Sequence, residues 1–416
     1  NFLYRSELGV ADAQEPDTYR LTPDEMATVL SFGFLGTAPS KTLLEEAEAG
    51  GLDTSEQVSA KVTTMLATDA GKDQFLQFIR YYTRTTLPPD EKPGLDATLS
   101  AAMWEEQAKF VRDVIGQASG TVDTLFNPGF TYLNKALADH YGIAGVSGSD
   151  LVKVTLVGQD RERWGGLLQQ GAFLASRSAS DAHVTSIVRR GFAVRENLLC
   201  RKFSAQENDN QPVIYPDRPV GMREHWNLRT LGTPEAPRTC WSCHQFVNDI
   251  GASMEHYDQT ARYRLQEFAV NQGFTDQLVD IDAKGSLVSN GGSMSWTDFN
   301  DVRGISRYLP KENQAMRCLA DGYYRFLFGD DAGVMGAKLV NDASQTLVAS
   351  GRLQDMLRQM ASADALRFRK DPAAPATTVQ PVPPVGPPGA KGATFHWPSP
   401  ARISQSQPEP SHDHVR

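Results

Sequence analysis

This 416-residue sequence has only four cysteines and no long apolar run. No stretch approaches the ~18 apolar residues that a membrane-spanning helix needs, so no transmembrane segment is predicted. The G-x-S-x-G, Walker and dinucleotide-binding motifs are absent, which leaves no signature of the enzymes that use them. The formal net charge is −9, so a nucleic-acid partner is not expected. The small basic pair Arg189-Arg190 is interpreted as a solvated helix face.

The first residues carry no secretion or lipidation signal. NFLYRSE is apolar and aromatic with no charged segment before it, which is typical of a chain that has lost a leader or an earlier domain. We therefore expect a processed chain. Its hydrophobic fraction of 40% and charged fraction of 22% are typical of a folded protein.

Helix signals dominate the first 145 residues. In TPDE, residues 22–25, a threonine N-cap, a proline at the first helical position and a glutamate three residues after the cap predict a helix over 23–34. Capping residues and apolar spacing predict further helices over 39–49, 55–66, 72–85, 95–116 and 131–140. Glu105 and Glu106 are adjacent on one of these helices and point in different directions, so they do not form a paired-carboxylate site.

The later part of the chain is also predicted to be helical, with long loops and little β-structure. LVKVTLVG predicts one strand, and the region 202–238, rich in Asn, Pro and Arg, predicts an extended loop. Helices are expected over 163–174, 187–200, 296–308, 311–328 and 344–369. The predicted fold is mainly α: a helical bundle domain (1–145), a second helical domain (146–265) and a C-terminal helical domain (266–370).

Residues 371–416 differ in composition from the rest. They are rich in proline and alanine and lack helical periodicity, which predicts an extended tail. Such a tail is either a solvated linker or a segment held by a partner subunit, with Phe395 and Trp397 as its anchors.

The motif Cys240-Trp241-Ser242-Cys243-His244 holds half of all the cysteines. A zinc site would need about four protein ligands, and no second half-site accompanies this one. A redox dithiol of the thioredoxin type would need a βαβ context, whereas a loop precedes this motif. Zinc, dithiol and disulfide-loop interpretations remain open but are poorly supported by the surrounding sequence.

A covalent haem accounts for all three chemically active residues. If Thr239 caps a short helix, Cys240, Cys243 and His244 stand at i, i+3 and i+4 and project from one face. The two thiols can then bond the two vinyl groups of one haem, with the imidazole beneath the iron. C-x-x-C-H is the haem-attachment signature, and its chance expectation from this composition is on the order of 10⁻³. We predict one haem c, which makes 146–265 a cytochrome-c-like helical domain.

Haem attachment also predicts the compartment. Cytochrome c maturation takes place outside the cytoplasmic membrane, where disulfides persist, so a periplasmic, outer-membrane-associated or extracellular bacterial location is expected. Cys200 and Cys318 are then candidates for one bridge, and the alternative is two buried free thiols.

The distal ligand of the iron decides the class of function, because a Met or His gives electron transfer and an open position permits peroxide or oxygen chemistry. Met294, in a glycine-rich loop downstream of His244, is the first candidate, and His225 is the second. Met222 and Met254 follow, although core packing is the usual role of methionine. Candidates for donors to the haem propionates are Arg262, Tyr263 and Arg264.

Several segments carry a family resemblance that extends almost to residue 369. They include FLYRSE, YRLTPDEMATVLSFGFLGTAPSKTLLEEAEAGGL, FTYLNKALADHYGI, GGLLQQGAFLASRS, TSIVRRGFAVRENLLC, CWSCHQFVNDIGASMEHYDQTARYR, VDIDAKGSL and CLADGYYRFLFG. The chain resembles the large secreted cytochrome-c-like proteins of planctomycetes and myxobacteria, built from consecutive domains of unknown function. The resemblance implies that this is a C-terminal portion, since such proteins usually carry further domains before FLYR. Ile187 and Asp249 depart from it by replacing usual prolines.

Two classes of function follow. The first is a c-type cytochrome-like electron-transfer subunit with one haem, inside a larger complex of protein subunits or redox partners. The alternative is a haem enzyme of the peroxidase or oxidase type, or a surface binding module with a structural haem. An electron carrier is favoured over a catalytic oxidoreductase.

Overall fold

Thr22 starts the first helix as predicted. Its side chain accepts a hydrogen bond from Glu25 N, and Glu25 in turn accepts from the Thr22 backbone at 2.8 Å, which completes a capping box. Side-chain caps also start the next four helices, because each is preceded by Ser, Thr or Asp. The helices are α1 Pro23–Phe34, α2 Lys41–Glu48, α3 Ser55–Ala67, α4 Asp69–Thr83 and α5 Ala97–Gly116.

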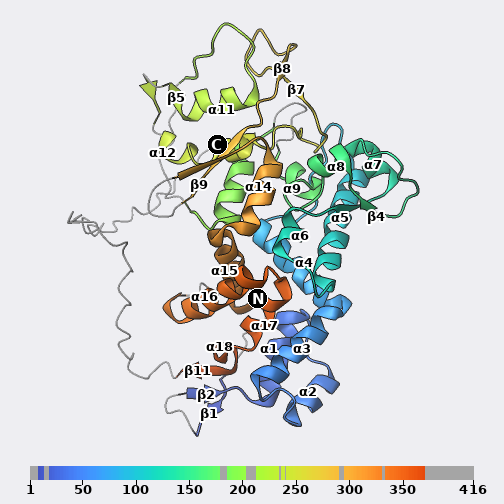
Figure 1. Cartoon of the computed structure of the whole chain (residues 1–416), viewed down its shortest axis with the longest axis vertical. Helices are drawn as coiled ribbons and strands as arrows, with labels where there is room; N and C mark the ends of the chain where they lie inside the picture. The colour runs from blue at the N-terminus through green and yellow to red at the C-terminus, as the bar shows by residue number, and fades with distance from the viewer. Residues whose placement is uncertain are drawn as a thin grey trace, which may run out of the picture. The chain divides into compact units, whose positions relative to one another are not determined.

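The computed structural model describes residues 8–13, 18–178, 185–202, 212–233, 236–238, 240–289, 295–329 and 333–370. The predicted tail, 371–416, lies outside them. The described chain is mainly α, as predicted (Figure 1). Its later helices are α6 Val122–Phe126, α7 Lys135–Tyr141, α8 Gly158–Arg163, α9 Gly171–Ala175, α10 Ile187–Phe192, the π-helix η1 Ala193–Leu198, α11 Met222–Thr230, α12 Trp241–His244, α13 Asn248–Ala252, α14 Val302–Tyr308, the 3₁₀ turn η2 Leu309–Lys311, α15 Asn313–Phe328, α16 Gly333–Ser350, α17 Leu353–Ala361 and α18 Asp364–Arg367.

The strands are short and form small antiparallel sheets. One has the order β1-β2-β11 and joins the two ends of the described chain, with Tyr19 opposite Arg369. Four pairs make up the rest of the β-structure in the described part: β3 with β4, β5 with β6, β7 with β8, and β9 with β10. Their bounds are β1 Val10–Ala11, β2 Thr18–Arg20, β3 Phe130–Leu133, β4 Val152–Thr155, β5 Gly232–Thr233, β6 Ala236–Pro237, β7 Gln266–Phe268, β8 Leu278–Asp280, β9 Gly285–Ser289, β10 Ser295–Phe299 and β11 Phe368–Lys370.

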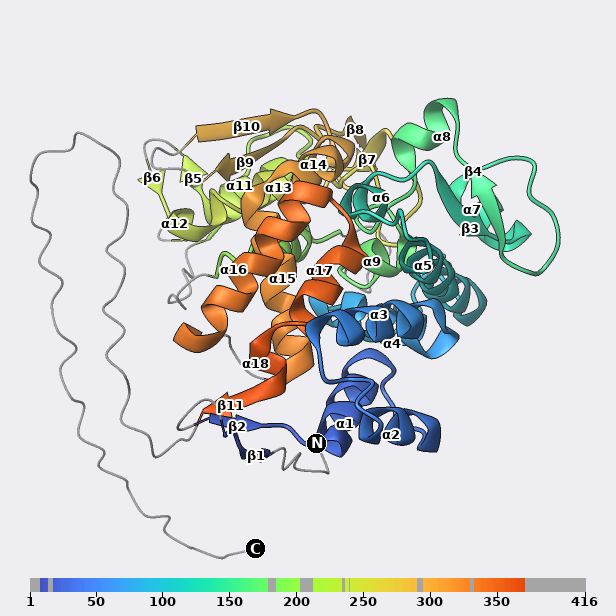
Figure 2. The same ribbon diagram turned by 60° about the horizontal axis from the view of Figure 1, so that its bottom comes forward.

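The last helices pack on the first ones. Tyr323 of α15 meets Phe78 of α4 edge to face, with ring centroids 4.9 Å apart, and Gln354 of α17 donates to Ile115 O at 2.8 Å. Figures 1 and 2 both show α17 beside α3. A continuous cluster of buried apolar residues runs from Leu21 to Leu366. The helices at both ends of the described chain therefore share one core.

Several predicted elements need correction. Residues 202–238 were predicted as an extended loop, but they contain α11; its sequence MREHWNLRT is mostly polar and has no side-chain cap, so its helix signal is weak. The predicted helix 296–308 begins as strand β10, because this segment pairs with β9. The predicted helix 131–140 likewise begins in β3. In the region where a helix over 163–174 was predicted, only residues 158–163 and 171–175 are helical.

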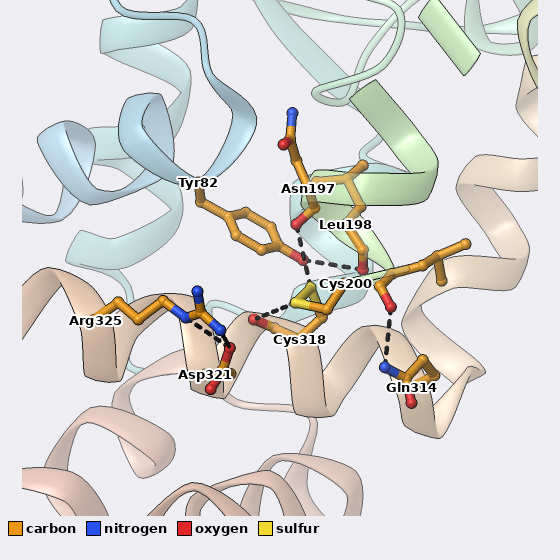
Figure 3. Close-up of a disulfide and its surroundings, with 9 residues drawn as sticks. Tyr82, Asn197, Leu198, Cys200, Gln314, Cys318, Asp321 and Arg325 are labelled. Atoms are coloured by element: carbon orange, nitrogen blue, oxygen red, sulfur yellow. Dashed lines mark hydrogen bonds and ion pairs between the residues drawn. A yellow bond between two sulfur atoms is a disulfide. The ribbon is translucent and has the colours of Figure 1, made fainter. Parts of the chain in front are cut away.

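Cys200 and Cys318 form a disulfide, as predicted, with Cα atoms 5.4 Å apart. The bridge joins Cys200, two residues after the end of η1, to the middle of α15. Figure 3 shows Tyr82 of α4 beside it, donating to Leu198 O at 3.3 Å, and Gln314 donating to Leu199 O at 2.9 Å. Three separate parts of the chain are therefore fixed together here.

No helix in the described ranges combines the length and the apolar character that crossing a membrane requires.

Glu106 of α5 is buried, whereas Glu105 beside it is half exposed and lies 3.9 Å from Arg112. The two carboxylates diverge, as predicted. Thr131 Oγ1 and Tyr141 OH donate to Glu106 at 2.5 and 2.7 Å. Burial away from any cation raises the pKa of Glu106 from 4.5 to about 7, because these two hydrogen bonds compensate only in part.

Glu106→Gln is expected to make the protein less sensitive to alkaline pH. Since the folded state raises this pKa, the protonated carboxyl stabilises the fold fully below pH 4.5, and that contribution is lost as pH rises towards 7. Between pH 4.5 and 8 the free energy of unfolding of the wild type should fall by about 3 kcal/mol relative to that of the variant. Urea unfolding at both pH values measures this. Glu105→Gln controls for the loss of a carboxylate. If the difference in unfolding free energy between wild type and Glu106→Gln were the same at both pH values, the prediction would be refuted.

Candidate functional site

The Cys-x-x-Cys-His motif forms a single helical turn. Cys240 O accepts hydrogen bonds from Cys243 N at 3.3 Å and from His244 N at 3.0 Å. Helix α12 begins at Trp241, with Cys240 in the cap position and helical in conformation. Thr239, the predicted cap, lies outside the described residues. Both motif thiols are free and partly accessible. The turn therefore carries two accessible thiols and one imidazole.

His244 is held by one hydrogen bond on its ring. Its Nδ1 pairs with Asn248 Oδ1 at 3.0 Å, four residues later. The Asn248 amide donates to Asn227 Oδ1 at 3.0 Å and to Thr230 Oγ1 at 2.8 Å, so α11 fixes its orientation. Because the Asn248 carbonyl oxygen can only accept, Nδ1 of His244 must carry the proton. In the neutral ring, Nε2 then has a free lone pair. Burial lowers the pKa of His244, and the hydrogen bond that its Nδ1 donates to Asn248 opposes this effect in part.

Helix α10 packs closely against the segment that follows the motif. A Cβ atom at Gly251 would lie 1.8 Å from Ile187 O, and one at Gly191 would lie 2.1 Å from Val247 O. Only glycine permits this approach of the two backbones. Phe192, at the end of α10, meets His244 edge to face with ring centroids 6.1 Å apart. The crossing therefore places an aromatic ring against the imidazole.

Arg190 ties α10 to the chain after α13. Its side chain is fully buried and donates to Met254 O and Tyr257 O, both at 2.8 Å, and to Asp258 O at 2.9 Å. The guanidinium also lies 3.4 Å from Glu255, which is buried as well. The prediction of a solvated Arg189-Arg190 face is therefore wrong for Arg190. A basic pair gives no sequence signal that one member enters the core.

The buried charges extend beyond Arg190. Arg264 lies 3.3 Å from Glu255 and 3.2 Å from Glu267, which also accepts from Met222 N at 2.8 Å. Burial, reinforced by the charge of Glu255, raises the pKa of Glu267 to about 7. This network joins α10, α11 and strand β7 around α13, so it fixes the elements that carry the motif.

The residues at the motif fit a covalent haem. Two free thiols and the free Nε2 of His244 share one turn, which is the donor set that C-x-x-C-H supplies. On α11, the Trp226 Nε1 donor is buried and has no partner within the described ranges. An unpartnered buried N–H on α11, the helix that holds Asn248, suits an acceptor such as a propionate carboxylate. Among the described residues, no three side chains of His, Cys, Asp or Glu are grouped to hold a metal ion.

The predicted distal ligands have different positions. Met294 lies outside the described residues, so its role stays a prediction. His225 Nδ1 pairs with Tyr215 OH at 2.7 Å, and the two rings stack. At about 100° per residue, His225 lies nearly opposite Asn227 and Thr230 on α11. No ring contact within the described part joins it to His244, and its role also stays a prediction. Met222 and Met254 are buried.

The predicted propionate donors have other partners. Arg262 Nε donates to His140 Nδ1 at 3.2 Å, and Tyr263 stacks on His256. Arg264 belongs to the buried charge network described above. Sequence reasoning missed Phe192, Asn248 and the buried position of Arg190. Only Asn248 carries a usable signal, since it follows His244 by four residues, the spacing that would place both on one face of a continuous helix.

Two regions of the chain match known families. Residues 21–143 match PSD4, described as a protein of unknown function (DUF1592), and residues 164–267 match PSCyt3, described as a protein of unknown function (DUF1588). Two consecutive regions of the chain are therefore each similar to a domain of unknown function. The second match contains the Cys-x-x-Cys-His turn, Asn248 and all of α10. No curated protein and no solved structure matches significantly.

Proposed function

We propose that this chain is a c-type cytochrome-like electron-transfer subunit that carries one covalent haem c. The observation that carries the proposal is the helical turn on which Cys240, Cys243 and the Asn248-oriented His244 lie together. When bound, the haem supplies a one-electron couple at its iron. The name of the second family, PSCyt3, and the succession of two domains of unknown function also support a relation to the secreted cytochrome-like proteins.

Each residue of the site has a separate task in this proposal. Cys240 and Cys243 would hold the haem through thioether bonds, and His244 would be its iron ligand from the motif. Asn248 holds the proton of His244 at Nδ1 and thus aims Nε2. Phe192 covers one side of the imidazole and limits its rotation. Met294, or His225 as runner-up, would supply the second protein ligand of the iron.

The location and partners follow from the same proposal. A haem attached through thioethers places the chain in the periplasm, at the outer membrane or outside the cell. The Cys200–Cys318 bridge supports such an oxidising compartment. Electron transfer requires a donor and an acceptor, which are redox partners or other subunits of a larger complex.

Carbon monoxide separates electron transfer from the alternative of a peroxidase-like or oxidase-like haem enzyme. With a protein ligand on each side of the iron, the reduced protein should be low-spin and its spectrum should not change with carbon monoxide. Absorption spectra of the dithionite-reduced protein, before and after addition of the gas, measure this. A high-spin reduced form that binds carbon monoxide rapidly would contradict electron transfer and favour the haem enzyme.

A further inference from the structure

A cavity of about 750 Å³ lies beside the disulfide, between the end of α4, the α10–η1 helix and α15. Its volume falls in the range that small-molecule sites occupy. Cys200 and Cys318 contribute to its wall. Phe192 lines it as well, and the same ring contacts His244. The cavity therefore borders the Cys-x-x-Cys-His turn without including it.

The charged side chains around this cavity are mostly cationic. Five are basic, and two, Glu196 and Asp321, are acidic. Asp321 pairs with Arg325 at 2.8 Å, as Figure 3 shows. Glu196 is then the remaining acidic residue of the described wall. The remaining basic residues are Arg84, Arg177, Arg189 and Lys202.

None of these four basic residues forms an ion pair with any residue that the structure describes. Arg84 lies over the Tyr81 ring at 5.1 Å, and Glu196 is the one acidic residue of the described wall left to offset the charge of these four. Such a concentration of unpaired cations in a concave site attracts anions. Arginine in particular presents a planar group of donors that matches carboxylates and phosphates.

Arg177 adds a buried positive charge at the same cavity. It is 7% exposed and donates to the neutral oxygens Thr83 O, Phe173 O and Thr85 Oγ1. Burial, aided by the nearby Arg190, lowers its pKa to about 9. A buried cation without a counter-charge is costly, and an anion in the adjoining cavity would offset that cost.

We propose that this cavity binds a small polyanion through its carboxylate or phosphate groups, with Arg84, Arg189 and Lys202 as the direct contacts. The positive charge of the buried Arg177 adds to the attraction of the anion. The aromatic rings of Tyr81 and Phe192 provide apolar walls for the rest of the ligand. This site goes beyond the proposed electron transfer and stands whether or not haem is attached.

Calorimetric titration of the full chain with citrate and with pyrophosphate tests the proposal and separates the two anion chemistries. At least one of them should bind at a single site, and neutral triethyl citrate should not. Arg189→Gln/Lys202→Gln should weaken binding roughly tenfold or more, because each removes a charge-assisted hydrogen bond. The control Lys41→Gln/Lys135→Gln removes two exposed charges from α2 and α7 and should bind as the wild type does.

Reduction of the disulfide gives a second measurement. The bound anion should slow reduction of Cys200–Cys318 by dithiothreitol in the wild type but not in Arg189→Gln/Lys202→Gln. Alkylation of the released thiols and peptide mass measurement monitor the reduction. Absence of binding by both anions up to about 10 mM, a range that covers even weak sites, would overturn the proposal. Equal weakening in the control pair of variants would also overturn it, because the attraction would then arise from net charge alone.

Discussion

Replacing Arg190 by methionine is expected to lower the free energy of unfolding by about 3–5 kcal/mol, the usual cost of breaking a buried ion pair from one side. The guanidinium bonds three backbone carbonyls and faces Glu255, all within the core. Methionine matches its length but donates no hydrogen bond. It would leave Met254 O, Tyr257 O and Asp258 O without this donor and Glu255 with Arg264 as its remaining cation.

Equilibrium denaturation in urea measures this loss, and the neighbouring residue provides a matched control. Arg189 lies on the same helix but is exposed. Arg189→Met should therefore change the stability by less than about 1 kcal/mol. If the two variants lost similar amounts, Arg190 would not hold α10 to the segment after α13 in the way described.

Removing the disulfide with Cys200→Ser/Cys318→Ala is expected to lower the free energy of unfolding by about 5 kcal/mol, since the bridge closes a long loop in the unfolded chain. The bridged residues are 118 positions apart, and the loop between them contains the entire Cys-x-x-Cys-His site. In the folded state the bridge joins η1 to α15 beside α4 (Figure 3). Its loss should therefore loosen the contact of the motif's helices with the bundle.

Dithiothreitol provides the internal control for this variant. The reductant should lower the wild type to the stability of the variant and leave the variant itself unchanged. Equal stability of the oxidised wild type and the variant would show that the bridge contributes nothing to the fold. A further loss in the reduced variant would assign the effect to another bond.

Local signals predicted the early helices well because each carries its own start. The Thr22 capping box and the Asp96 cap fix the first residues of α1 and α5 without help from the rest of the chain. Helix α11 has no such cap and a mostly polar sequence, and it is held by contacts of Asn227 and Thr230 with Asn248. Pairing with β9 likewise decided strand β10, which replaces the start of the helix predicted over 296–308.

At the candidate site, spacing along one turn was enough to group Cys240, Cys243 and His244. The supports of that turn come from elsewhere in the chain and depend on tertiary packing. Phe192 reaches the imidazole only because Gly191 and Gly251 allow two backbones to touch. Arg190 is buried only because three carbonyls of a distant segment converge on it. No local pattern encodes either contact.

The intact mass of the protein, purified from a bacterium that matures c-type cytochromes, tests the central claim most directly. We predict a mass increase equal to one haem, carried by the peptide that contains Cys240 and Cys243, and a pyridine haemochrome spectrum of the c type. The variant Cys240→Ala/Cys243→Ala should keep the Cys200–Cys318 bridge and lose the added mass. A wild-type protein with no haem mass, or with the same mass increase in that variant, would contradict the assignment of the motif.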